Sequence, residues 1–441
     1  MNLDAGRSDD QAPLRIAYLF QQFPLPTEAF AVSDVAALLA QGHRVTIYTM
    51  KRSRRNERDL LSLCGVPAGL PIDRPSTSAA LSWPKLMWRS RKPALALARR
   101  IAASTASAPR EALEALLCIP RLVEITERIK AGNVDVAHAF WSRHVGLVLP
   151  LLEADEAPAL RSAFVGAYDL IADDFLVGMT LDSAETVFSH AEANRAYVHR
   201  KAPRGATSQI ISRGIPLLPL ASDTRREPYR CITASALTPS KNVDDVINAC
   251  ALAREQEPRL TLHIFGDGPD KGRLEQLSRE RGGSGWISFG GHVSRAELFT
   301  EMQRASLFLL LSRKPSERLP NVIKEALWAG CNVISANSEG IEELIPNPGI
   351  GQIVDPVTPE RASTAVLQVL GESEEDAVKR RVRARAMIEE RFSSDHSMRR
   401  YVEAWHEAIA RRLQSPRPPA RRGGRSRRQA PPGARQVSPP R

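Results

Sequence analysis

Features that mark secreted, membrane-spanning and dinucleotide-binding proteins are scarce in this sequence of 441 residues. The five cysteines are scattered without a paired spacing, and no apolar run is long enough to cross a bilayer. We therefore expect reduced, largely buried thiols in a cytoplasmic protein that has neither a signal peptide nor a spanning helix. The sequence also has no Walker-type phosphate loop, no complete dinucleotide-binding Gly-rich turn and no credible Asp-x-Asp metal site.

Acidic residues are outnumbered by basic ones, 50 to 61, which gives a formal charge of +11. Eight arginines and no acidic residue lie in residues 413–441, so the rest of the chain carries only about +3. This tail contains seven prolines and little apolar surface to bury, so we predict that it is disordered. A solubilising extension explains it more simply than binding to anionic lipid or nucleic acid, and we expect no specific nucleic-acid partner.

Short apolar segments alternate with helical ones along most of the chain, which is typical of an α/β fold with parallel sheets. The apolar segment 14–20, the helical pattern 28–41 and the apolar segment 45–49 together predict a βαβ unit. Further strands are predicted at 134–137, 163–165, 186–188 and 209–211, and then at 231–235, 260–265, 287–289, 307–310, 333–335 and 352–354.

A Pro-rich polar stretch interrupts this alternation once and divides the chain into two parts. We predict two tandem Rossmann-like, doubly wound domains at residues 13–214 and 229–394, joined by a linker at 215–228. A helix at 395–412 precedes the disordered basic tail at 413–441. Because ligands bind outside the carboxyl ends of the strands in such folds, we expect the functional site in a cleft between the two domains.

The most informative segment is 307–330, where a strand and a polar loop lead into a helix. Pro320 suits the first helical position. The backbone N–H groups at the helix start, around Leu319, Asn321 and Val322, and the positive end of the helix dipole predict a site for phosphates. Glu325, one turn into the helix, can accept two hydrogen bonds from a ribose diol.

Two further residues extend this candidate site. Glu317, in the loop at the strand end, is expected to point toward a sugar. Gly266 begins a Gly-Asp-Gly turn after the segment 260–265. This turn either only reverses the chain or also touches the nucleotide.

Glu317 and Glu325 are separated by seven residues, and in this setting they resemble the Glu-x7-Glu motif of retaining glycosyltransferases of family four, which have two Rossmann-like domains of the GT-B type. Segments 238–242 (Thr-Pro-Ser-Lys-Asn), 262–269, 319–326 and 340–345 resemble other motifs of that family, and segments 23–30 and 42–45 look like members that build bacterial surface polysaccharides. The resemblance spans about residues 14–406 and is strongest over 231–354.

The resemblance implies transfer of a sugar from a nucleoside-diphosphate sugar to a saccharide or lipid-linked acceptor, with retained anomeric configuration and without a metal or other cofactor. It implies that Lys241 neutralises the diphosphate leaving group, that Glu325 holds the ribose and that Glu317 contacts the sugar. His138 follows the strand segment 134–137, in the place of the family's acceptor-side histidine, where it would hydrogen-bond or accept a proton. A histidine that merely closes a strand is an equal alternative.

Two positions depart from the family pattern. Ala236 stands where an arginine commonly contacts the diphosphate, and Arg318 replaces the glycine that usually follows the first motif glutamate. Arg213 and Arg318 are candidates to replace the missing cation. The alternatives are a catalytically weak or inactive nucleotide-sugar-binding scaffold of the same fold, and a nucleotide-sugar epimerase.

Residues 82–92 contain two tryptophans among basic residues and lead into an apolar helical segment at 94–102. This combination is typical of an interfacial membrane segment, and a buried helix with a solvated basic face explains it equally well. Together with the basic run 51–55, it suggests peripheral contact with an anionic membrane at the inner face of the cell membrane, where a lipid-linked acceptor would lie.

Overall fold

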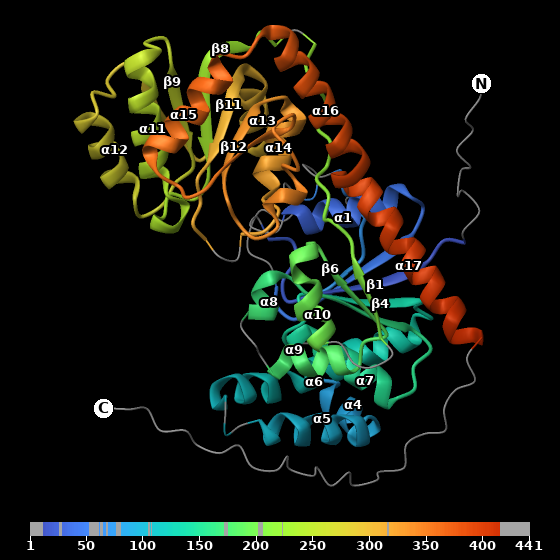
Figure 1. Ribbon diagram of the computed structural model, residues 1–441. Helices are drawn as coiled ribbons and strands as arrows, with labels where there is room; N and C mark the ends of the chain where they lie inside the picture. Colours follow the sequence, from blue (N-terminus) through green and yellow to red (C-terminus); the bar gives the residue numbers. More distant parts are fainter. Residues whose placement is uncertain are drawn as a thin grey trace, which may run out of the picture.

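The computed structural model describes residues 12–25, 29–52, 61, 65–67, 69–75, 81–104, 106, 108–171, 175–201, 206–222, 224–314 and 317–414. Nearly all of the tail predicted to be disordered, the thiol of Cys64 and most of the basic run 51–55 lie outside these described residues. The described part of the chain forms two α/β domains, which lie one above the other in Figure 1.

The first domain contains a seven-stranded parallel sheet with the order β3-β2-β1-β4-β5-β6-β7. Its strands are β1 (Arg15–Phe20), β2 (Arg44–Thr49), β3 (Ile72–Asp73), β4 (Val136–Phe140), β5 (Leu160–Phe164), β6 (Thr186–Ser189) and β7 (Thr207–Ile210). Ile16 of β1 pairs with Val45 of β2 and with Val136 of β4. Only β3 has no counterpart in the sequence prediction, because two residues are too few to form an apolar pattern.

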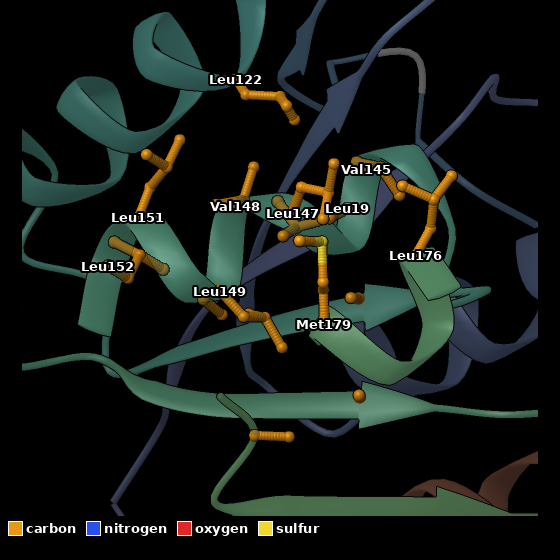
Figure 2. Close-up of a cluster of buried hydrophobic side chains, with 14 of the residues drawn as sticks. Leu19, Leu122, Val145, Leu147, Val148, Leu149, Leu151, Leu152, Leu176 and Met179 are labelled. Carbon is orange, nitrogen blue, oxygen red and sulfur yellow. The ribbon is translucent and has the colours of Figure 1, made fainter. Parts of the chain in front are cut away.

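Helices cover both faces of this sheet. They are α1 (Ala29–Ala40), α4 (Trp83–Arg89), α5 (Arg91–Ala103), α6 (Pro109–Ala131), α7 (Val148–Ala154), α8 (Ala167–Ile171), α9 (Phe175–Asp182) and α10 (Arg195–Lys201). On one face, Leu122 of α6 and several aliphatic residues of α7 pack with Leu19 of β1 and Met179 of α9 (Figure 2). This cluster is the larger of two apolar cores in the first domain.

The last helix, α17 (Ser394–Gln414), returns to the first domain and lies beside α1 (Figure 1). Its residues Tyr401 and Trp405 are buried in the core on the second face of the first sheet. Trp405 Nε1 donates a hydrogen bond to Ser162 Oγ of β5 at 3.0 Å. The helix predicted at 395–412 therefore completes the core of the first domain.

The second domain contains a six-stranded parallel sheet with the order β10-β9-β8-β11-β12-β13. Its strands are β8 (Glu227–Ala234), β9 (Thr261–Phe265), β10 (Ile287–Gly291), β11 (Ala305–Leu310), β12 (Asn332–Ala336) and β13 (Gly351–Val354). Its helices are α11 (Val243–Gln256), α12 (Lys271–Glu280), α13 (Arg295–Arg304), α14 (Asn321–Ala329), α15 (Pro359–Leu370) and α16 (Glu374–Phe392). Each strand overlaps a predicted segment, although β8 begins inside the predicted linker 215–228.

The chain crosses between the domains twice, and the two crossings touch. The backbone N–H of Ile215 donates to Phe392 O at 2.7 Å, and that of Ser394 donates to Ile215 O at 2.9 Å. A Cβ atom on Gly214 would lie 2.1 Å from the carbonyl group of Ser393. Glycine is therefore needed at this position because the two backbones approach too closely for any side chain.

Helices α4, α5 and α6 form a layer on the outside of the first domain. Trp83 Nε1 of α4 donates to Glu124 Oε2 of α6 at 3.1 Å. One face of α5 is buried, whereas Leu95 on the same helix is 51% exposed. Among the described residues, no helix combines the length and the apolar character that a membrane span requires.

Candidate functional site

The carboxyl ends of the two sheets face each other, because residues that follow β6 contact residues that follow β11 and β12. Arg318 donates to Asn194 Oδ1 of the first domain and pairs with Glu339 of the second domain. The backbone N–H of Glu192 donates to Glu343 Oε1 at 2.8 Å. This junction is where the sequence predicts the functional site.

Lys241 and Glu317 form an ion pair at the carboxyl end of the second sheet, although 76 positions separate them in the chain. Their side chains are only 16% and 15% exposed. Lys241 Nζ contacts Glu317 Oε1, and Glu317 Oε2 is buried without a hydrogen-bond partner among the described residues. A polar ligand that entered here would meet both an ammonium group and an unsatisfied carboxylate oxygen.

The backbone brings these two side chains together. The N–H of Arg313, in the loop after β11, donates to Ser240 O at 2.9 Å. Asn242 has the left-handed φ of 54°, and its side chain donates to Leu311 O at 3.1 Å. The turn before α11 is therefore attached to the loop before α14.

The start of α14 presents the predicted N–H groups, but the predicted position of Pro320 is wrong by one residue. Pro320 has an extended ψ of 128° and precedes the helix, which begins at Asn321. The first hydrogen bond runs from Ile323 N to Pro320 O at 3.1 Å, so the N–H groups of Asn321 and Val322 precede the intrahelical bonds. Leu319 is buried and has a φ of 50°, which turns the chain sharply into the helix.

Glu325 lies one turn inside α14, and its side chain is 14% exposed. Arg295 Nη2, from the first residue of α13, lies 2.6 Å from Glu325 Oε1. Burial raises the pKa of Glu325, and the charge of Arg295 opposes that rise. The carboxylate is thus a largely buried acceptor whose ionised form is favoured mainly by Arg295 and, less strongly, by Lys324.

Gly266 is required by packing in the turn after β9. Its φ is +124°, and a Cβ atom there would lie 1.8 Å from Ser235 O at the end of β8. A Cβ atom on Gly268 would similarly lie 2.3 Å from Leu237 O. Close contact between two loops explains both glycines, so a nucleotide contact at Gly266 stays a prediction.

The structure contradicts the acceptor-side role predicted for His138. His138 lies inside β4 rather than after it, and its side chain is fully buried in the core of the first domain. Its Nδ1 is 2.8 Å from Ser162 Oγ, and the rings of Tyr401 and Trp405 lie against it. Burial lowers the pKa of His138 to about 3, so the ring is neutral at neutral pH. Helix α17 packs against His138, at the position where the sequence analysis expected an acceptor.

Arg213 is also buried and already has an anionic partner. Its Nη2 lies 2.6 Å from Asp34 Oδ2 of α1. Its guanidinium lies 4.5–4.6 Å from the ring centres of Phe30, Phe140 and Phe164. Arg318 is likewise paired, so both candidates to replace the cation missing at Ala236 hold carboxylates of the protein itself.

Two residues at the junction were missed by the sequence analysis. Lys324 is 1% exposed, and its Nζ donates to Arg213 O at 2.7 Å and to Asn321 Oδ1 at 3.0 Å. Burial lowers the pKa of Lys324 to about 7. His190 follows β6, its Nδ1 is buried without a partner among the described residues, and burial lowers its pKa to about 3. The only sequence signal for either residue was the position of Lys324 on the apolar face of a predicted helix.

Within the described ranges, no group of three or more His, Cys, Asp and Glu side chains is arranged to hold a metal ion. Four cysteines there are free thiols, and the Sγ atoms of Cys231 and Cys250 are 3.9 Å apart in the core of the second domain.

Comparison with known proteins finds similarity to a known family within the second domain. Residues 221–387 match the family model for glycosyl transferases group 1. The amylovoran biosynthesis glycosyltransferase AmsK of Erwinia amylovora is 26% identical over 185 residues, which are 41% of this chain and 45% of that protein. A GDP-mannose-dependent phosphatidylinositol monomannoside mannosyltransferase of Mycobacterium tuberculosis is 29% identical over 34% of this chain and 42% of its own length. The chain thus matches less than half the length of these relatives.

Solved structures match over nearly the whole chain at low sequence identity. Anabaena HepE in complex with UDP has a TM-score of 0.65 at 15% identity, covering 89% of this chain and 100% of that one. A glycosyltransferase from Rickettsia africae has a TM-score of 0.60 at 16% identity, covering 90% and 99%. Residues 221–387 thus match the glycosyl transferases group 1 family model, and the chain that contains them has the two-domain α/β fold of the GT-B glycosyltransferases.

Proposed function

We propose that this chain is a glycosyltransferase that moves a sugar, with retained anomeric configuration, from a nucleoside-diphosphate sugar to a saccharide or lipid-linked acceptor in surface polysaccharide synthesis. The observation that supports this most directly is the grouping of Lys241, Glu317 and the start of α14 at the carboxyl end of the second sheet. The names of the relatives agree with it, since one takes part in amylovoran biosynthesis and one is crystallised with UDP.

The donor diphosphate would bind to the N–H groups of Asn321 and Val322 and to the Lys241 ammonium. Lys241 would have to exchange the Glu317 carboxylate for a phosphate. That exchange would release Glu317 to accept a hydrogen bond from a hydroxyl of the donor sugar. Binding of the donor would therefore prepare the carboxylate that contacts the sugar.

The leaving group is the nucleoside diphosphate, and negative charge grows on it as the glycosidic bond breaks. A fixed ammonium and the positive end of α14 would stabilise that charge without rearranging. We propose no metal and no other cofactor, because these groups supply the required positive charge. Glu325 would hold the ribose and thereby set the position of the diphosphate.

One observation favours an alternative, a weak or inactive scaffold that binds nucleotide sugars. Position 236 is alanine, and both arginines that could replace the missing cation are already paired with carboxylates. Loss of one preorganised cation costs about 3 kcal/mol of transition-state stabilisation. An epimerase would differ from both, because it would release an altered donor without any acceptor.

An acceptor with a lipid anchor would explain the outer layer of the first domain. Trp88 of α4 is 71% exposed, and Leu113 and Leu117 of α6 are 58% and 73% exposed. Exposed basic residues accompany them, and Arg91 stacks on the Trp88 ring at 4.8 Å. We propose that this layer rests on an anionic membrane from the cytoplasmic side, with the protein bound peripherally.

Thermal unfolding in the presence of UDP-, GDP- and ADP-sugars tests the donor site. A ligand that binds only the folded chain raises its stability by about 2.7 kcal/mol at a concentration of 100 times Kd. We expect one nucleotide class to stabilise the protein and Glu325→Ala to abolish the effect. Glu375→Ala, at an exposed position of α16, is the matched control.

Turnover then separates the enzyme from the scaffold. Release of nucleoside diphosphate from the stabilising donor, with formation of a glycoside on an added membrane extract, supports the glycosyltransferase. Donor binding without release of diphosphate would favour the scaffold. No stabilisation by any donor would contradict both.

A further inference from the structure

The Glu325 carboxylate forms an ion pair with a cation from a neighbouring helix, Arg295, and Lys324 adds a second, weaker positive charge nearby. Arg295 Nη2 lies 2.6 Å from Glu325 Oε1, and the two side chains are 28% and 14% exposed. Arg295 Nε is buried without a hydrogen-bond partner among the described residues. The pair therefore lies in a partly enclosed position, where a charge interaction is stronger than at an open surface.

Both residues project from backbone that is fixed. Ser294 Oγ caps α13 by accepting from Glu297 N at 3.2 Å, and Glu297 Oε2 accepts from Ser294 N at 2.8 Å. This reciprocal capping box orders the first turn of α13, where Arg295 is the first helical residue. Glu325 lies in the second turn of α14, where the helical backbone holds it. Two ordered helices thus determine the direction of the ion pair.

We propose that Arg295 is a positioning residue that orients the Glu325 carboxylate toward the two ribose hydroxyls, and that the donor site thereby selects ribonucleotides over deoxyribonucleotides. This inference rests on the proposed role of Glu325 in donor binding. Arg295 would not itself need to touch the nucleotide. Its effect would pass through the orientation and the charge of Glu325.

The chemistry of the carboxylate explains why one cation has this effect. An ionised carboxylate offers about four lone-pair sites, so it can hold one arginine and still accept two hydroxyl hydrogen bonds. A protonated carboxyl group loses part of that capacity. Burial raises the pKa of Glu325 and Arg295 opposes the rise, so removal of Arg295 would both free the side chain to rotate and favour its neutral form.

Calorimetric titration with UDP, GDP and ADP first identifies the base that the wild-type chain binds. The same nucleoside diphosphate is then compared with its 2′-deoxy form. We expect the wild-type chain to bind the ribonucleotide about tenfold more tightly, since hydrogen bonds to a charged acceptor have this size. Arg295→Met should reduce the ratio to about twofold or less, and Arg295→Lys should retain part of it.

Arg273→Met is the matched control, because Arg273 is half-exposed on α12 and pairs with Asp244 and Asp270. The ribose preference should survive in this variant. An unchanged preference in Arg295→Met would overturn the inference and leave the donor site intact. A wild-type chain that binds none of the three nucleotides would instead contradict the proposed function itself.

A second variant covers the case in which Arg295→Met does not fold. Arg295→Gln keeps a hydrogen-bond donor without the charge. Its ribose preference should be weaker than that of the wild-type chain, because Glu325 loses the larger of the two charges, Arg295 and Lys324, that lower its pKa. A preference equal to that of the wild-type chain would contradict the inference.

Discussion

The buried hydroxyl of Ser162 connects two segments that lie far apart in the chain. Trp405 Nε1 can only donate, so Ser162 Oγ accepts its hydrogen at 3.0 Å, and the same Oγ forms a hydrogen bond with His138 Nδ1 at 2.8 Å. A residue of β5 thus links the middle of β4 to the last helix of the chain.

Replacing Ser162 with alanine should leave two buried polar atoms without partners. We expect Ser162→Ala to lower the free energy of unfolding by about 2 kcal/mol or more. Ser142→Ala, which removes a single hydrogen bond to Phe164 O, should cost about half as much. Denaturant unfolding followed by tryptophan fluorescence measures both values. Equal costs would show that the two contacts of Ser162 are not both made.

The buried Lys324 should make the free energy of unfolding rise with pH. A surface lysine whose ion pair raises its pKa has the opposite effect. Burial lowers the folded pKa of Lys324 to about 7, whereas an unfolded lysine has a pKa of about 10.4. Between these values the unfolded chain binds one more proton, so the free energy of unfolding rises with pH by up to about 1.4 kcal/mol per pH unit. Below about pH 7 the full burial penalty is present.

Lys324→Met should remove this slope. The difference in unfolding free energy between the wild-type chain and the variant, measured at pH 7, 8 and 9, should move in favour of the wild-type chain as pH rises. Lys379→Met, at an exposed position of α16, should show no such trend. A constant difference between the wild-type chain and Lys324→Met would mean that Lys324 keeps its ordinary pKa in the folded chain.

Site residues could be predicted from the sequence where they follow strands of the same sheet. They could not be predicted where their surroundings come from distant segments of the chain. Lys241 and Glu317 were placed in one site because both follow strands of the same sheet, and the structure brings them into contact. His138 was misplaced because its burial depends on α17, a helix from the far end of the chain. The partners of Arg213 and Arg295 also come from distant segments, and no local pattern predicts such contacts.

At the scale of secondary-structure elements, the turn after β9 shows how closely two loops are fitted. The carbonyl of Ser235 occupies the space into which a side chain at Gly266 would project. Its left-handed φ also disfavours any other residue. This turn fixes the end of β9 against the segment that leads to Lys241.

Gly266→Ala should therefore shift this turn and lower the free energy of unfolding by about 2 kcal/mol or more. Thermal unfolding measures the cost. Gly272→Ala is the control, because a Cβ atom on Gly272 in α12 would have no atom within 4 Å apart from its chain neighbours and the backbone of its own helix. That variant should be neutral or slightly stabilising, since alanine favours a helix. Similar losses for the two variants would contradict the close approach at Gly266.

The positions along the chain and the approximate bounds of nearly all described strands could be predicted, because strands buried in parallel sheets are short, continuous apolar runs. β3 could not, since its two residues are held by pairing with β2 rather than by their own pattern. The start of α14 was misplaced by one residue because proline is accepted both before and at the first helical position. Element boundaries depend on backbone angles that composition does not specify.

At the scale of the whole molecule, Arg318 connects the two domains. Its guanidinium contacts Asn194 of the first domain and Glu339 of the second, and its side chain is 1% exposed. The backbone crossings at Ile215 and Ser394 lie elsewhere and act as the second connection. The relative position of the domains is therefore set both at this junction, where Glu192 N also donates to Glu343 Oε1, and at the crossings, where Lys324 Nζ donates to Arg213 O.

Arg318→Ala should loosen one of these points without unfolding either domain. We expect faster amide hydrogen exchange in the segments around Asn194 and Glu339, with exchange in β8 and β11 unchanged. Arg313→Ala, which removes an exposed ion pair within the second domain, should leave exchange at the junction as it is. Unchanged exchange at the junction in Arg318→Ala would show that this contact does not hold the domains.

The return of α17 to the first domain has a consequence for synthesis on the ribosome. Tyr401 and Trp405 fill the core on one face of the first sheet, yet they are translated after the entire second domain. A nascent chain can therefore bury the opposite face, shown in Figure 2, long before it can close this one. The first domain would therefore expose this apolar face while the second domain is synthesised and folds. We expect a ribosome-associated chaperone to bind the exposed face during that time.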